Sequence, residues 1–321
     1  MSERAAILVT RKLPEAVEAR LKRDYRVLLN PEDALYPSEK LLALSRDADA
    51  ILACHTEHFN AELIAQLPER IRAIANFSVG VDHVDLEAAR ARGLIVTNTP
   101  DVLADATAEV AILLMLGAAR RASEGERLVR SGEWNTWSPA FMVGTQVTGK
   151  RLGILGMGRV GQVTARRARG FDMFIHYHNR QRLPAELEAG ATFHDSVEDM
   201  LPHCDFLAVH CPSTPETQDL INAKRLALLP DGAILVNVAR GNVVDEHALI
   251  AALASGRLRA AGLDVYKNEP DILPALRAVT NTFLLPHIGS ATRETRDAMG
   301  FRALDNLDAI FSGAEPGDRV A

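Results

Sequence analysis

Cysteine is scarce in this chain, and its placement argues against two kinds of site. The three cysteines, Cys54, Cys204 and Cys211, form neither a disulfide framework nor the paired spacing of metal ligands. An odd number of isolated cysteines is typical of a protein from a reducing compartment. We therefore expect a cytoplasmic protein that has no metal site.

The chain also lacks long hydrophobic runs. The longest, Val110 to Ala119, has ten residues, whereas a membrane-spanning helix needs about 20. The opening MSERAAILVTRKLP does not resemble a signal peptide, because its apolar stretch is short and Arg11 and Lys12 follow it. We expect a soluble protein with no membrane partner, and a buried helix at Val110–Ala119.

Neither sign of charge is in large excess. The 36 Lys and Arg residues oppose 42 Asp and Glu residues, a net charge of −6 at pH 7. Mild acidity without a long basic run argues against a nucleic-acid partner, so any anion site must be local. The chain also has no HExxH or similar cluster, which disfavours a metal-dependent hydrolase.

What the chain does have is an alternation of short apolar runs and helical stretches, and its 321 residues are enough for two domains. Such alternation predicts parallel sheets covered by helices, an α/β fold. In the first hundred residues we expect strands at Ala6–Val9, Val27–Leu29, Ile51–Ala53, Ile71–Ala75 and Leu94–Thr97, and helices at Pro14–Arg23, Ser38–Ser45 and Leu86–Arg92.

A second alternation begins at Arg151, after a long helix at Asp105–Ala119 and an ordered loop at Arg130–Gly149 that contains both tryptophans. The expected strands are Leu152–Leu155, Met173–Tyr177, Thr192–Phe193, Phe206–Val209, Ala233–Val238, Ala260–Asp264 and Phe283–Leu285, and a last helix is expected at Thr292–Phe311. We predict a dinucleotide-binding domain, residues 100–288, inserted into a substrate domain of residues 1–99 and 289–321.

A glycine-rich turn follows the first strand of the second alternation. Gly156, Gly158 and Gly161 have GxGxxG spacing between a strand and a helix. The first glycine permits the tight turn, the second lets the backbone approach a pyrophosphate, and the third lets helix pack against strand. This context predicts a bound dinucleotide; a purely structural glycine turn is the alternative.

The acid that usually binds the ribose hydroxyls of NAD is missing. The strand Met173–Tyr177 ends in His178, Asn179 and Arg180 instead. A carboxylate would repel a 2′-phosphate, whereas Arg180 can pair with one. We therefore predict a preference for NADPH over NADH. In the alternative, Arg180 and Arg182 belong to a solvated turn and the protein uses either cofactor.

Three more strands end in chemically useful groups. They lead to Arg240, to Glu269 and to His287. In open α/β sheets, ligands bind at the carboxyl edge of the strands, so these three side chains are candidates for one site.

The segments around these residues, VNVARGNVVDEHALIAAL, AAGLDVYKNEP and LLPHIGSAT, resemble the signature segments of the D-isomer-specific 2-hydroxyacid dehydrogenases. The resemblance extends to the glycine loop, to NFSVGVDHVDLEAARARG and to NTPDVLADATAEVA, and so covers most of the chain from Asn76 onward. Within the family, SVGVDH, NTWSPAF and the missing ribose acid look most like the glyoxylate/hydroxypyruvate reductases. The fold it implies pairs a flavodoxin-like substrate domain with an inserted Rossmann-like domain.

The resemblance implies a role for each member of the Arg–Glu–His set. Arg240 would bind the substrate carboxylate with its planar fork of donors. His287 would be the general acid that protonates the carbonyl oxygen. Glu269 would orient the imidazole and favour its charged form. The substrate would also meet Val79, Gly80 and Ser290, together with Trp137 of a neighbouring subunit, which implies a homodimer.

The cofactor residues that the resemblance implies lie around the glycine loop and at the strand ends. They are Thr107, Gly156, Gly158, Arg159, Val160, Gly161, His178, Asn179, Arg180, His210, Cys211, Pro212, Thr217, Val238, Ala239, Asp264 and Gly289. Two alternatives stay open: Asp264 as a mere strand-end hydrogen-bonding group, and Trp137 as core or dimer packing. Cys211 has no base beside it and is expected to be a buried filler, not a nucleophile.

The sequence thus predicts reduction of a small 2-oxo acid, glyoxylate or hydroxypyruvate, by NADPH, with NAD also possible. A 2-ketogluconate reductase is the second candidate, and other D-2-hydroxyacid dehydrogenases, such as a short phosphoglycerate dehydrogenase, come third. Dinucleotide-sensing corepressors share this fold without being enzymes, but they carry extended interaction regions that this sequence does not show.

Overall fold

The computed structural model describes residues 4–321, which divide into two compact units. Unit 1 comprises the chain up to Leu103 and again from Ala291 to Ala321, and unit 2 is the continuous stretch Ala104–Ser290. The sequence placed the boundaries after residues 99 and 288, a few residues before those seen in the structure. No helix among the described residues is both long and apolar enough to pass through a bilayer.

Unit 1 is built on a five-stranded parallel sheet with strand order β2-β1-β3-β4-β5, the flavodoxin-like order. Its strands are β1 (Ala6–Val9), β2 (Arg26–Leu28), β3 (Ala50–Ala53), β4 (Ala73–Asn76) and β5 (Ile95–Thr97). Its helices are α1 (Glu15–Asp24), α2 (Ser38–Ser45), α3 (Ala61–Gln66), α4 (Leu86–Arg92) and α13 (Arg293–Ser312).

Alternate residues of these strands feed two separate cores. Ile7 and Val9 of β1 pack with α1 and α13, whereas Leu8 packs with α2, α3 and α4 on the other face. Helix α13, at the far end of the chain, therefore covers the sheet made by the first hundred residues. At Gly300 it lies so close to α1 that an added Cβ would come within 2.3 Å of Val17 Cγ2.

Unit 2 contains a seven-stranded parallel sheet, order β12-β11-β10-β9-β6-β7-β8. The strands are β6 (Arg151–Leu155), β7 (Phe174–His178), β8 (Thr192–Phe193), β9 (Phe206–Val209), β10 (Ala233–Asn237), β11 (Leu258–Leu263) and β12 (Thr282–Leu284). From β8 to β11 this is the Rossmann order, with the reversal of strand order between β6 and β9 where dinucleotides bind; β12 extends the sheet.

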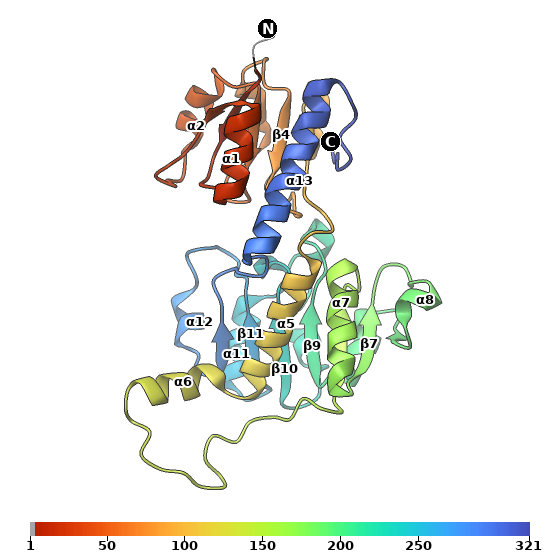
Figure 1. Ribbon diagram of the computed structural model, residues 1–321. Helices are drawn as coiled ribbons and strands as arrows, with labels where there is room; N and C mark the ends of the chain where they lie inside the picture. Colours follow the sequence, from red (N-terminus) through yellow and green to blue (C-terminus); the bar gives the residue numbers. More distant parts are fainter. Residues whose placement is uncertain (1–3) are drawn as a thin grey trace. The chain divides into compact units, whose positions relative to one another are not determined.

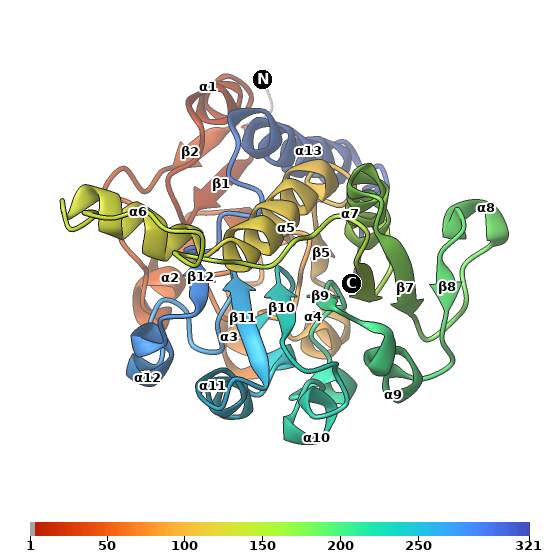
Figure 2. The ribbon, with the colours of Figure 1, turned by 90° about the horizontal axis from the view of Figure 1, so that it is seen from below.

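Helices cover both faces of this sheet. One face carries α5 (Ala104–Ala119) and α7 (Arg159–Ala168), and the other carries α9 (Val197–Met200), α10 (Ala223–Leu226), α11 (Glu246–Ala254) and α12 (Pro274–Ala278) (Figures 1 and 2). The remaining elements are α6 (Ala122–Arg130), α8 (Ala185–Glu188) and the 3-10 turns η1 (Arg169–Phe171), η2 (Leu201–His203), η3 (Pro215–Thr217) and η4 (Gly241–Val243).

The predicted fold class, two parallel-sheet α/β domains, is confirmed, and the expected strands are all present with ends displaced by at most two residues. The two-residue displacements are at the starts of β4 and β11. At these two places the run of apolar residues and the hydrogen bonds to the neighbouring strand begin at different residues. Helix α4 ends, as expected, at Gly93, whose φ of +70° suits a residue without Cβ. The segment after α6, residues 131–150, contains neither helix nor strand.

Candidate active site

The glycine loop between β6 and α7 has a geometry that favours a phosphate ligand. Gly156 has φ +94°, and a Cβ there would lie 2.6 Å from Cys211 N. A Cβ on Gly161 would lie 2.6 Å from Gly156 O, which explains the close packing of the helix start. At Gly158 no atom lies within 4 Å of an added Cβ, so this glycine is not required by packing. Gly158 is the N-cap residue of α7 and is followed by Arg159 and Val160 in its first turn, and the start of a helix is a position that favours a phosphate group.

The end of β7 holds this loop in place. The amide of Gly156 donates to His178 O at 3.0 Å, and the amide of Met157 donates to Asn179 Oδ1 at 2.6 Å. Ring nitrogen Nδ1 of His178 lies 2.9 Å from His194 O. His178 and Asn179, two of the expected cofactor residues, are therefore part of the frame of the loop.

The two arginines after β7 differ in their surroundings. Arg182 forms a double hydrogen bond with Glu188, whose Oε1 also accepts from Tyr177 Oη at 2.5 Å. The hydrogen bonds from Arg182, which has the larger effect, and from Tyr177 lower the pKa of Glu188 to about 2. Arg180 is exposed, and its charge helps, after a hydrogen bond from Thr214, to lower the pKa of Glu216 in η3. Arg180 thus lies within electrostatic reach of the β9 loop, while Arg182 is held by Glu188.

The end of β9 forms the neighbouring wall. The imidazole of His210 is buried, neither ring nitrogen has a hydrogen-bond partner in the described chain, and burial lowers its pKa to about 4. Burial raises the pKa of Cys211 to about 11, which keeps it a thiol. Thr217 Oγ1 donates to Pro212 O at 2.8 Å and accepts from Thr214 N at 2.7 Å, and so closes this turn.

Arg240 follows β10 on an anchored backbone. Buried Asn237 donates to Arg240 O at 2.9 Å and accepts from the amide of Ala239 at 3.0 Å, a bracket that also spans Val238. The next residue, Gly241, lies against the loop after β11, because an added Cβ would be 1.9 Å from Tyr266 C. The loops that carry Arg240 and Glu269 are therefore in direct backbone contact.

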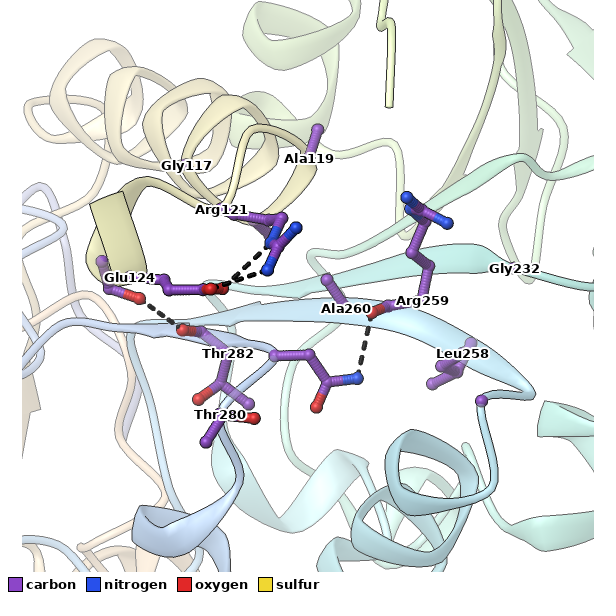
Figure 3. A pocket seen from close by; sticks show the side chains of 14 residues that line it. Gly117, Ala119, Arg121, Glu124, Gly232, Leu258, Arg259, Ala260, Thr280 and Thr282 are labelled. Carbon is purple, nitrogen blue, oxygen red and sulfur yellow. Dashed lines mark hydrogen bonds and ion pairs between the residues drawn. The ribbon is translucent and has the colours of Figure 1, made fainter. Parts of the chain in front are cut away.

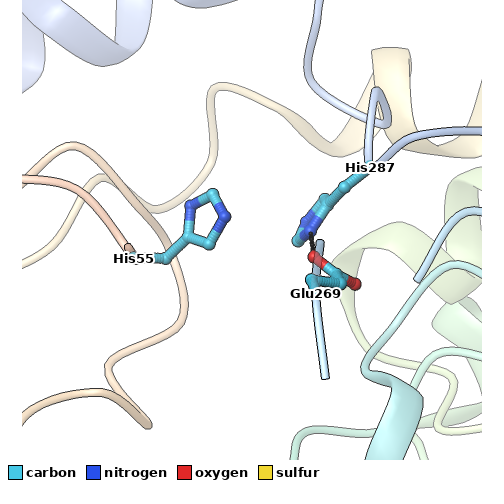
Figure 4. A group of neighbouring side chains, drawn as sticks. All are labelled: His55, Glu269 and His287. Carbon is cyan, nitrogen blue, oxygen red and sulfur yellow. Dashed lines mark hydrogen bonds and ion pairs between the residues drawn. The ribbon is translucent and has the colours of Figure 1, made fainter. Parts of the chain in front are cut away.

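Glu269 and His287 form a close pair (Figure 4, which also draws His55 of unit 1). His287 Nδ1 lies 2.5 Å from Glu269 Oε2, and the amide of Tyr266 donates to Glu269 Oε1 at 2.7 Å. With Nδ1 turned to a carboxylate, the ring presents Nε2 as its second proton-carrying position.

Asp264 sets the backbone of the loop that carries this histidine. The amides of Ile288 and Gly289 each donate to a different oxygen of Asp264 at 2.8 Å. His287 itself has φ +54°, a left-handed conformation that a non-glycine residue keeps only where its surroundings impose it. Burial raises the pKa of Asp264, and the two amides oppose that shift. Each oxygen of Asp264 accepts one amide and retains a second lone pair, so both interpretations of this residue stay predictions.

The N-terminus of α5 adjoins the same loop. A Cβ on Gly289 would lie 3.3 Å from Thr107 Cγ2, so the first turn of α5 packs against the residues that lead to Ser290. Because β10, β11 and β12 are parallel neighbours, unit 2 brings the loops of Arg240, Asp264, Glu269 and His287 to one edge of its sheet.

Val79 and Gly80 belong to unit 1, in the loop after β4. Asn98 Nδ2 donates to Val79 O at 2.8 Å and Ser78 Oγ donates to Gly80 O at 2.7 Å, which fixes the two peptide planes. Beneath the loop, His83 Nε2 lies 2.8 Å from Asn76 Oδ1. His83 therefore supports this loop, as a structural residue would.

Trp137 is not brought to the other site residues of unit 2. It is 76% exposed and lies in the 131–150 segment, which returns to the C-terminal end of α5 through the bond from Thr145 N to Ala119 O. That end of α5 meets the sheet where β11 and β12 begin, the edge opposite to His287. A pocket of about 360 Å³ opens there, bordered by the Arg121–Glu124 ion pair and by Arg259 (Figure 3). It contains none of the predicted site residues.

Sequence reasoning missed Asn237 and Glu246. Glu246 is buried at the start of α11 and accepts the amide of Lys267 at 2.8 Å, which fixes the loop that leads to Glu269. In the sequence, both read as ordinary polar residues near a strand end or a helix start.

Comparison with known proteins agrees with this geometry. Residues 112–289, inside unit 2, match the family model described as D-isomer specific 2-hydroxyacid dehydrogenase, NAD binding domain. The chain is 44% identical to the glycerate dehydrogenase of Hyphomicrobium methylovorum, over 96% of this chain and 97% of that protein. It is 46% identical to a glyoxylate reductase of Thermococcus kodakarensis, over 98% and 95%.

Solved structures show the same relationship. A glyoxylate reductase from Paecilomyes thermophila superposes with a TM-score of 0.89 at 37% identity, over 100% of this chain and 99% of that one. An NADPH-dependent glyoxylate/hydroxypyruvate reductase from Sinorhizobium meliloti, in complex with NADP and malonate, gives 0.88 at 36% identity, over 99% and 97%. The chain belongs to the family of D-isomer specific 2-hydroxyacid dehydrogenases.

Membership confirms the predicted family, the prediction of an enzyme and the use of a nicotinamide dinucleotide. The individual site residues, the choice between NADP and NAD, and the cytoplasmic location stay predictions.

The glycine loop supplies a test that separates packing from ligand binding. Gly158→Ala should change the free energy of unfolding by less than about 1 kcal/mol, yet raise the dissociation constant of NADPH about tenfold or more, since the added methyl occupies the phosphate path. Gly156→Ala should instead destabilise the protein by about 2–3 kcal/mol, because it combines a positive φ with a backbone clash. Denaturant unfolding and fluorescence titration with NADPH measure both effects. Unchanged NADPH affinity in Gly158→Ala would place the dinucleotide elsewhere.

Proposed function

We propose that this enzyme reduces a small 2-oxo acid, glyoxylate or hydroxypyruvate, to the D-2-hydroxy acid and prefers NADPH. The observation that carries the proposal is the 2.5 Å contact between His287 Nδ1 and Glu269 Oε2, on the sheet edge that also holds the Arg240 loop. The names of relatives, glyoxylate reductase and glycerate dehydrogenase, support a substrate of this size.

Arg240 binds the substrate carboxylate in this proposal. Its guanidinium offers two parallel N–H donors to two carboxylate oxygens, and the Asn237 bracket restricts the backbone from which it extends. Ser290 keeps its predicted role beside the substrate. Val79 and Gly80, whose peptide planes are fixed within unit 1, keep their predicted role as peptide donors.

His287 handles the proton. A bound nicotinamide supplies a hydride from C4 of its ring to C2 of the oxo acid. As negative charge develops on the carbonyl oxygen, Nε2 of His287 donates a proton to it, and Glu269 stabilises the imidazolium from which that proton comes. In the reverse direction the same nitrogen accepts the proton from the hydroxyl group.

The two roles predict different kinetic defects. His287→Ala should lower kcat for glyoxylate by about 10²- to 10⁴-fold, the usual contribution of a general acid. Arg240→Lys should mainly raise the KM for glyoxylate, because an ammonium group cannot form the paired bonds of a guanidinium. Steady-state kinetics measure both, and an unchanged dissociation constant for NADPH is the control. Retention of wild-type kcat by His287→Ala would remove the histidine from the chemistry.

Substrate length discriminates this proposal from the second candidate, a 2-ketogluconate reductase. A panel of glyoxylate, hydroxypyruvate and 2-ketogluconate, each with NADPH and with NADH, compares kcat/KM directly. A highest value with 2-ketogluconate would favour the second candidate.

The cofactor preference depends on Arg180. It is the exposed arginine after β7, whereas Arg182 is bound to Glu188, and no carboxylate ends the strand to repel a 2′-phosphate. The NADP complex of the Sinorhizobium meliloti relative supports this choice.

Arg180→Ala should raise the KM for NADPH about tenfold, the loss of about 1.4 kcal/mol of charge-assisted bonding. The KM for NADH, which has no 2′-phosphate, serves as the control in the same variant and should stay unchanged. A wild-type enzyme with higher kcat/KM for NADH than for NADPH would contradict the assignment.

A homodimer completes the proposal. Exposed apolar side chains gather on α5, α6 and the segment that follows: Leu113, Val129, Trp134, Trp137 and Val143. Such clustering is typical of an interface. Trp137 lies far from the carboxyl ends of the strands in its own unit 2. We propose that it reaches the active site of the second copy.

Complementation tests this arrangement. Trp137→Ala and His287→Ala each lower activity, but a heterodimer of the two variants contains one site with both wild-type residues if they come from different copies. Co-expression with two affinity tags, followed by tandem purification, should therefore yield more activity than either variant alone. Sedimentation velocity should show a dimer. Heterodimers with no gain in activity would place Trp137 within its own subunit's site, or outside catalysis.

A further inference from the structure

Three imidazoles that are not among the predicted site residues lie together in unit 2. They belong to His176, His194 and His203. Nδ1 of His176 lies 3.0 Å from Nε2 of His194. The ring centroids are 5.2 Å apart for His176 and His194, 5.5 Å for His176 and His203, and 5.3 Å for His194 and His203. We call this group the histidine cluster.

Three different elements bring the histidine cluster together. His176 lies within β7, between the buried residues Ile175 and Tyr177, so its side chain points to the opposite face of the sheet. His194 follows β8, the edge strand, and pairs through its backbone with β7. His203 ends η2, directly after α9, which lies beside these strands in Figure 2.

The frame that holds the cluster is stiff, although His203 itself is exposed. His194 O is fixed by the 2.9 Å contact with His178 Nδ1, and the buried side chain of Leu201 anchors η2 to the core. Nearby Arg151 is neutralised by a double hydrogen bond with Asp205. Two of the rings are therefore positioned by the fold, and the third can rotate at low cost.

A purely structural role leaves part of this arrangement unexplained. One N–H···N bond between His176 and His194 would stabilise the β7–β8 edge, but it does not need a third ring stacked at an interplanar angle of 7° on the first.

The geometry points to a binding site for a transition-metal ion of the zinc, copper or nickel type at His176, His194 and His203. The 3.0 Å separation of the first two nitrogens is close to the separation of about 3.3 Å expected for two ligands at 2.0–2.1 Å from a tetrahedral ion. Imidazole is a preferred ligand of these ions. In the present conformation Nδ1 of His176 and Nε2 of His194 share one proton in a hydrogen bond, and His203 is stacked on His176. Binding an ion therefore requires that this proton moves to the other nitrogen of its ring and that all three rings rotate, and water completes the shell.

The sequence predicts no metal site, because it shows no metal-ligand spacing, so this proposal departs from that expectation. The three histidines are separated by 17 and 8 intervening residues, which matches no short metal motif. Their proximity depends on the pairing of β7 with β8 and on the turn after α9. The site is also independent of the proposed oxo-acid chemistry, since none of its members has a role there.

Titration calorimetry with zinc chloride, on the full chain after treatment with a chelator, tests the proposal. We expect one ion per chain with a dissociation constant in the micromolar range or tighter. His194→Gln should weaken binding at least tenfold, and the exposed His203→Gln, which leaves the fold frame intact, should weaken it by a smaller factor. His247→Gln, an exposed histidine on α11, is the matched control and should bind as the wild type does.

A second measurement keeps the test decisive if a variant folds poorly. The electron paramagnetic resonance spectrum of bound Cu²⁺ should show coupling to several imidazole nitrogens in the wild type, and fewer in His203→Gln. Zinc binding that is unchanged in both His194→Gln and His203→Gln would overturn the proposal and place the ion elsewhere, for instance at His287. Absence of binding below about 1 mM zinc would also overturn it.

Discussion

The buried carboxylate of Asp264 accepts hydrogen bonds from two backbone amides. These two bonds determine the shape of the candidate active site. The bonds from Ile288 and Gly289 join the end of β11 to the loop after β12, and they hold His287 in a left-handed conformation. Glu269, itself fixed by the amide of Tyr266, then meets an imidazole whose position is already defined. The position of the acid–base pair therefore depends on a connection between the ends of two strands.

The same device recurs along the carboxyl edge of the sheet. Asn237 brackets the Arg240 turn, Asn179 binds the glycine loop, and Glu246 fixes the segment before Glu269. In each case a polar side chain at the end of a strand or the start of a helix satisfies the backbone of a neighbouring loop. Loops are usually the more mobile parts of a fold, and here they are tied to the rigid sheet at the points where the chemistry is expected.

Much of this could be read from the sequence, because the signals are local. An apolar run marks each buried strand, and GxGxxG and the polar residues that follow strands mark the ligand edge. Asn237 and Glu246 escaped prediction, because the partners they bind are set by strand order. The two readings of Asp264 could not be separated either, since its partners lie 24 and 25 residues away. The histidine cluster could not be predicted either, because its three members are distant in the sequence and are brought together by the pairing of strands.

The insertion of unit 2 into unit 1 imposes an order on biosynthesis. The core beside β1 and β4 includes Met299, Leu304 and Ile310 of α13, which leave the ribosome only after the whole of unit 2. Unit 2 is continuous and is fully synthesised before α13 exists, so its sheet can close first. Until then α1 alone covers this face of the unit 1 sheet, and the nascent chain leaves the apolar surface that α13 will bury open to chaperones while unit 2 is made.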